Sequence, residues 1–142
     1  MSLCELKFGQ KWNLIYKAIQ DGFKSSDFHS KCDDKPNTLI IIKSINGNVF
    51  GGYTEQTWNH TDGYKNDPNS FIFSLINKLN KTIKVKSTKD FSIYCINNEG
   101  PWFGGDIVIA DNSNTNTNSY SNLGIHPDYV PGSNEARSFL AG

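Results

Sequence analysis

The sequence predicts an α+β protein with a mainly antiparallel sheet, or a β-sandwich, with flanking helices. Two helical segments come first, and six short strands follow them along the 142-residue chain. Most strands are joined by short turns, and the sequence shows no strand–helix–strand alternation. Because parallel strands need long crossover connections, this order favours antiparallel pairing.

Residues 10–21 are predicted to form an amphipathic helix, because apolar residues recur there at helical spacing. Gly22 follows Asp21 and is expected to end this helix in a left-handed conformation. The apolar stripe consists of Trp12, Ile15, Tyr16 and Ile19.

A second, shorter helix is expected after Gly22. Phe28 and Cys32 are four residues apart and would share one face of it, and residues 33–36 would end it. The residues expected to cap its start are Ser25, Ser26 or Asp27.

The first two strands are predicted as a hairpin. Residues 38–43 are short, apolar and β-branched, which is typical of a buried strand. Asn46-Gly47 is a strong signal for a tight turn, and residues 48–54 form the return strand. Gly51 and Gly52 lie inside that strand, so we expect a bulge or a close backbone approach there.

Four more strands follow, separated by polar turns. The segments 57–69 and 97–101 are turn-rich, and residues 111–122 are so rich in Asn, Ser and Thr that we expect a long exposed loop. The four strands are predicted at residues 70–76, 82–87, 91–96 and 106–110.

Charge and cysteine content limit the function classes. Lys+Arg and Asp+Glu are both 14, so the formal net charge is zero and a nucleic-acid partner is not expected. The lysines of residues 78–89 are expected to protect a solvated strand edge. Three scattered cysteines, with neither a signal peptide nor an apolar span, favour the reducing cytoplasm.

No residue pattern identifies a metal or catalytic site. His29 and Cys32 have zinc-ligand spacing, but a structural zinc site needs a second pair. The loop from Asp111 begins like a calcium-binding loop and lacks its glycine and glutamate. Cys95 is expected in the core, while Cys32 is either a core residue or a redox-sensing thiol beside His29. We therefore assign no catalytic, cofactor or metal residues, and a hydrolase without a recognisable motif stays an alternative.

Five segments, in this order, resemble TLDc domains. The first three are DFHSKCD at 27–33, TLIIIK at 38–43 and VFGGY at 49–53. They are followed by SFIFSL at 70–75 and GPWFGGDI at 100–107. The resemblance extends over residues 14–120 and implies a sandwich of two antiparallel sheets with helices packed at one side.

The resemblance also implies a role. TLDc proteins are linked to protection against oxidative damage, and several bind and regulate the vacuolar proton-pumping ATPase. The family has no established catalytic residues, so we expect a non-catalytic protein-interaction module. The chain is expected to be one domain, 1–142, that ends before the last strand of the family pattern. A missing strand would leave a sheet edge open and favour a dimer.

Overall fold

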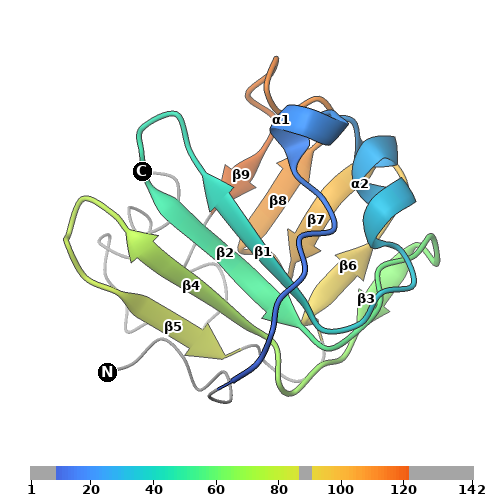
Figure 1. Ribbon diagram of the computed structural model, residues 1–142, viewed down its shortest axis with the longest axis horizontal. Helices are drawn as coiled ribbons and strands as arrows, with labels where there is room; N and C mark the ends of the chain where they lie inside the picture. Colours follow the sequence, from blue (N-terminus) through green and yellow to red (C-terminus); the bar gives the residue numbers. More distant parts are fainter. Residues whose placement is uncertain (1–8, 87–90, 122–142) are drawn as a thin grey trace.

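The computed structural model describes residues 9–86 and 91–121 as two layers of antiparallel strands with two short helices at one end (Figure 1). One layer is a four-stranded sheet of order β1-β2-β4-β5. Its strands are β1 (Thr38–Lys43), β2 (Val49–Thr54), β4 (Phe71–Ile76) and β5 (Ile83–Lys86). This architecture confirms the predicted α+β class with antiparallel sheets.

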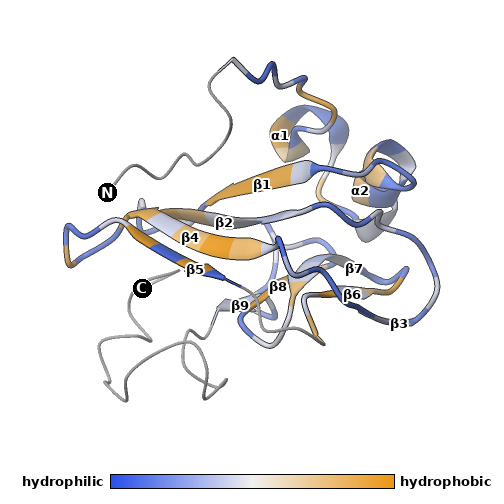
Figure 2. Cartoon of the chain, turned by 90° about the horizontal axis from the view of Figure 1, so that it is seen from below, coloured by the Kyte–Doolittle hydropathy of each residue, from blue (hydrophilic) through white to orange (hydrophobic). Residues whose placement is uncertain are grey.

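The second layer contains two smaller sheets, of order β3-β6 and β7-β8-β9. Figure 2 shows the four-stranded sheet on one side and strands β6 to β9 on the other. The strands of this layer are β3 (Gly63–Lys65), β6 (Ile93–Cys95), β7 (Glu99–Phe103), β8 (Ile107–Ala110) and β9 (Tyr120–Ser121).

The core lies between the layers and beneath helix α2 (Ser25–Cys32). Phe50 and Ile72 come from the four-stranded sheet, and Phe103 and Ile107 come from the opposite layer. Trp58, from the loop after β2, packs edge-to-face against both Phe28 and Phe103. One continuous apolar cluster therefore joins both layers and the helix.

The predicted helix at residues 10–21 is wrong over most of its length. Helix α1 (Ala18–Asp21) is a single turn, and Lys17 before it is extended. The predicted stripe does not share one buried face, because Ile15 and Tyr16 pack against the core whereas Ile19 is 74% exposed. Because short helices depend on such packing, residues 10–17 run instead along the outer face of the four-stranded sheet, where Trp12 contacts Tyr53.

Helix α2 ends where predicted, but it begins at Ser25, one of the residues expected to cap it. Lys24 is the N-cap, and Asp27 accepts a hydrogen bond from the Lys24 backbone N–H at 3.1 Å. The Ser25 N–H donates to the Asp111 carboxylate at 2.6 Å, a partner 86 residues away. Gly22 ends α1 as predicted, but with φ +112° and ψ 163° it is not in the expected left-handed helical conformation. A Cβ there would lie 2.1 Å from the Asp27 carboxylate.

All six predicted strands are present, with ends shifted by at most two residues. The glycine pair makes the predicted close approach, because a Cβ on Gly52 would lie 2.7 Å from the Phe103 ring. The lysine-rich segment forms the edge strand β5, and the Lys84 ammonium lies 4.1 Å from the centre of the Phe71 ring.

Three strands escaped prediction: β3, β7 and β9. Strand β7 includes Pro101, and it lies at the edge of its sheet with a register shift between Glu99 and Trp102. An edge position tolerates proline because the missing N–H faces away from the ladder. The predicted loop at 111–122 is turn-rich over its described part, but Asp111 is half-buried and β9 ends the described segment.

None of the helices in residues 9–86 and 91–121 is long and apolar enough to span a membrane. The expectation that the chain ends before the family's last strand concerns positions outside the described residues.

Candidate functional site

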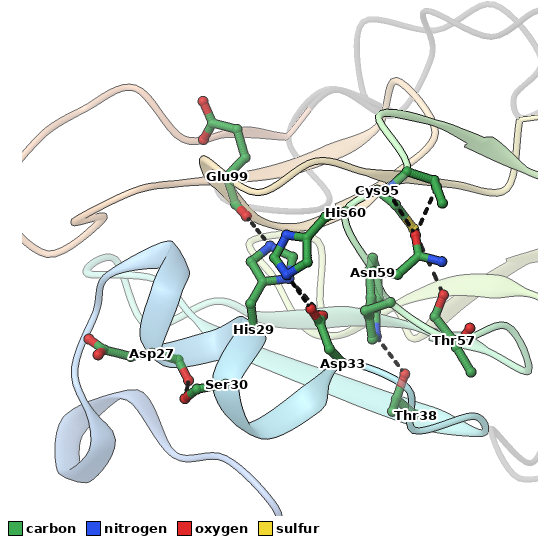
Figure 3. A network of polar contacts seen from close by, with 12 residues as sticks. Asp27, His29, Ser30, Asp33, Thr38, Thr57, Asn59, His60, Cys95 and Glu99 are labelled. Carbon is green, nitrogen blue, oxygen red and sulfur yellow. Dashed lines mark hydrogen bonds and ion pairs between the residues drawn. The ribbon is translucent and has the colours of Figure 1, made fainter.

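Three polar side chains meet where α2 ends (Figure 3). His29 lies on α2, Asp33 directly follows the helix, and His60 lies in the loop between β2 and β3. The Asp33 carboxylate lies 2.7 Å from His29 Nδ1 and 2.8 Å from His60 Nε2. The two imidazole rings are 4.9 Å apart between centroids. We call these residues the His–Asp–His cluster.

Local structure explains why the cluster assembles. His29 and Asp33 are four residues apart, so the helix places them on one side. Asp33 forms a parallel bridge with Trp58, and the Asp34 N–H donates to the Trp58 carbonyl at 3.1 Å. Trp58 is 1% exposed, and its indole N–H donates to Thr38 Oγ1. This anchored tryptophan lies two residues before His60 and brings it to the helix end.

The cluster extends from the core to the surface. His29 is 6% exposed, whereas the side chains of Asp33 and His60 are 17% and 57% exposed. In the described residues this is the only group of three or more histidine, cysteine or acidic side chains whose ligand atoms lie close together. Its outer end is therefore accessible to a small ligand.

Hydrogen bonding fixes the state of the His29 ring. His29 Nε2 lies 3.0 Å from the Glu99 carbonyl oxygen, which can only accept, so Nε2 carries a hydrogen. The other nitrogen, Nδ1, faces the Asp33 carboxylate, which is also an acceptor when ionised. With Nε2 engaged by the Glu99 carbonyl, Nδ1 is the ring nitrogen available to a ligand on the Asp33 side.

The sequence did not reveal this cluster. It associated His29 with Cys32, and it gave no reason to place His60, 31 positions along the chain, beside them. The His29–Asp33 spacing was the one available signal, and such i, i+4 pairs are common on helix surfaces.

Cys32 belongs to the core rather than to a reactive site. Its side chain is 1% exposed, and burial raises the pKa of the thiol to about 12. Because the thiolate is the reactive form, this environment opposes redox sensing at neutral pH. Cys95 is likewise 1% exposed in β6, as predicted for a core residue.

Asp111 has a structural role that competes with calcium binding. One carboxylate oxygen accepts the Ser25 N–H, and the other accepts from Asn112 Nδ2 at 2.6 Å. Both oxygens are thus already engaged by the protein, and the residue serves to hold α2 against the loop after β8.

Comparison with known proteins adds three relatives. The chain is 30% identical over 69 residues to the MTOR-associated protein MEAK7 of Xenopus laevis, a match that spans 49% of this chain and 15% of the relative. The proteins of the same name from Danio rerio and Gallus gallus are 23% identical over 64 residues and 26% identical over 69. These matches cover 45% and 49% of this chain, and 14% and 15% of those relatives.

A family model described as TLDc domain matches residues 2–135. That span contains all five segments that resemble the family, and the two-layer antiparallel architecture with flanking helices is the one that the resemblance implies. The chain therefore belongs to the TLDc domain family.

Proposed function

We propose that this chain is a non-catalytic TLDc module that acts in the cytoplasm by binding a protein partner, the vacuolar proton-pumping ATPase, and so contributes to protection against oxidative damage. Family membership carries the proposal, because TLDc proteins act through binding and have no established catalytic residues. An exposed apolar groove beside β1 supplies a physical basis for binding.

An open groove of about 1670 Å³ lies along residues 10–19, β1 and the outer face of the four-stranded sheet. Large apolar side chains line it and remain exposed: Leu14 at 78%, Ile19 at 74% and Ile41 at 61%. Contiguous exposed apolar surface is typical of an interaction site. We call this surface the β1 groove.

The charge of the β1 groove indicates what it binds. Among the described residues that line it, Glu55 is the only acidic one, although the whole chain carries no formal net charge. Such an apolar groove with a basic rim suits a partner segment that combines apolar and acidic side chains. The lining lysines are Lys11, Lys17, Lys24, Lys35, Lys43, Lys84 and Lys86.

A pair of isoleucine variants tests the proposal. Ile41→Glu places a negative charge in the β1 groove, whereas Ile76→Glu places one at the end of β4, where Ile76 is similarly exposed at 58%. We expect Ile41→Glu to weaken capture of the ATPase from native cell extract by about tenfold or more, equivalent to about 1.4 kcal/mol. The Ile76→Glu variant should bind like the unmodified chain.

Two outcomes would overturn the proposal. Equal capture by both variants would exclude the β1 groove as the binding surface. Failure of the unmodified chain to enrich any ATPase subunit over a tag-only control would exclude the partner.

The names of the relatives favour a second candidate partner. All three matched proteins are called MTOR-associated. We therefore propose an mTOR-containing assembly as the alternative, and the same capture experiment separates the two. Recovery of mTOR without ATPase subunits, lost in Ile41→Glu, would replace the first partner by the second.

A further inference from the structure

We propose that the His–Asp–His cluster binds one divalent transition-metal ion, with zinc as the preferred ion. Two imidazoles and one carboxylate form a donor set that zinc accepts readily. None of the three residues lines the β1 groove, so this site is independent of the proposed partner surface.

The distances suit a single ion. One ligand atom from each residue lies within 4.8 Å of the other two. Tetrahedral zinc with bonds of about 2.0–2.1 Å places its ligand atoms about 3.3 Å apart. The His29 Nδ1–Asp33 Oδ1 and His60 Nε2–Asp33 Oδ2 contacts of 2.7 and 2.8 Å involve different carboxylate oxygens. Binding of one ion requires these contacts to widen by roughly half an ångström and the two imidazole nitrogens, which lie within 4.8 Å, to approach a common centre. The exposed His60 ring has room to make that adjustment.

His29 is already oriented as metal-binding histidines are. Its Nε2–H donates to the Glu99 carbonyl of β7, which fixes the ring and directs Nδ1 toward Asp33. In known metal sites the second ring nitrogen almost always makes such a hydrogen bond. The position of this ligand is thus set by two elements, α2 and β7.

Asp33 is held equally firmly. Its backbone N–H donates to the His29 carbonyl at 3.1 Å, and its backbone bridges to the buried Trp58. Two of the three ligands are consequently fixed before an ion arrives, which lowers the conformational cost of binding.

An ion would lie between His29 Nδ1 and the Asp33 carboxylate, which are 2.7 Å apart without it. Any hydrogen that these two atoms share leaves to solvent as a proton when the ion binds. Three protein ligands leave a fourth position for water at the exposed His60 end. The ion would cross-link the end of α2 to the loop before β3.

The test is zinc titration of the purified full chain after treatment with a chelator. We expect calorimetry to show one ion per chain with a dissociation constant of about a micromolar or tighter. His60→Ala should weaken binding about tenfold or more, and its exposed position makes misfolding a poor explanation. Cobalt(II) supplies a second readout, because four-coordinate cobalt with nitrogen ligands absorbs strongly in the visible range.

Asp33→Asn and Asp34→Asn form a matched pair for this titration. Both remove one carboxylate charge, but Asp34 is exposed, has φ +59° that asparagine tolerates, and contributes no ligand atom. We expect binding to be weakened only in Asp33→Asn. An absence of saturable binding, or equal affinity in His60→Ala, Asp34→Asn and the unmodified chain, would overturn the metal site.

Discussion

At the scale of single residues, Gly52 sets the distance between the layers. Its backbone faces the ring of Phe103, which is 2% exposed and held within the core. Any side chain at this position would have to displace that ring or separate β2 from β7. The paired glycines in the sequence predicted a close approach to the β2 backbone, but they did not identify Phe103 as the group that approaches it.

We expect Gly52→Ala to lower the free energy of unfolding by about 1–3 kcal/mol, because overpacking a closed core strains its neighbours. Urea denaturation measures this change. Gly105→Ala is the control, since a Cβ at Gly105 meets no atom within 4 Å. Equal stability of the two variants would contradict the close packing.

His60 illustrates what residue patterns leave hidden. Its place beside His29 depends on Trp58, which is anchored through a hydrogen bond to Thr38 at 2.9 Å. Helical spacing pairs His29 with Asp33, but no periodicity connects an α2 residue with a loop beyond β2. Tertiary contacts of this kind become visible only in the folded chain.

At the scale of elements, α2 depends on a residue outside its own sequence. The Ser25 N–H, unpaired within the helix, donates to Asp111, and this hydrogen bond lowers the pKa of the carboxyl below its ordinary value of 3.8. A negative charge at the N-terminus of a helix also interacts favourably with the helix dipole. Local capping preferences therefore predicted helix α2, but they could not predict that Asp111 accepts a hydrogen bond at its start.

Asp111→Ala should destabilise the protein at neutral pH, and the difference from the unmodified chain should shrink in acid. The pKa of Asp111 is lower in the folded than in the unfolded state, so its contribution is full above about 3.8 and is lost as pH falls through the lowered value. Urea unfolding at about pH 6 and about pH 3 measures the two differences. A difference that stays constant with pH would argue against a charged cap.

The segment before α1 shows the limit of periodicity as a signal. Its apolar spacing fits a helix, yet Trp12 packs against Tyr53 of β2 and Leu14 faces solvent. Apolar periodicity leads to a helix only where the rest of the protein offers an apolar surface that buries the whole stripe. Here the neighbouring sheet does not offer such a surface. Strand β7 shows the reverse case, because its glycine and proline indicate a turn while its edge position permits a strand.

At the scale of the whole molecule, the two outer strands of the larger sheet differ. Strand β5 carries Lys84 and Lys86, and charged edges resist pairing with another chain. Strand β1 carries Leu39 and Ile41 and pairs, within the described residues, with β2 alone. Antiparallel pairing and the first hairpin could be predicted from the sequence, whereas the strand order in each sheet and this difference between edges required the structure.

We expect the chain to self-associate at high concentration through β1. Light scattering should show an apparent mass that rises with concentration toward that of a dimer. Ile41→Glu should reduce this rise, because a charge on the edge strand disfavours pairing. A monodisperse monomer across the whole concentration range would contradict the prediction.

The long-range attachments of α2 have a consequence for how the chain folds during synthesis. Two hydrogen bonds hold the helix to parts of the chain made much later. Ser25 donates to Asp111, 86 positions further on, and His29 donates to the Glu99 carbonyl, 70 positions further on. Closing such long loops is entropically costly and slows folding. Because a nascent chain emerges from the ribosome N-terminus first, we expect α2 to lack these two contacts until Glu99 and Asp111 have been translated. The fixed position of α2 thus depends on β7 and on the residue that follows β8, both of which are synthesised long after the helix.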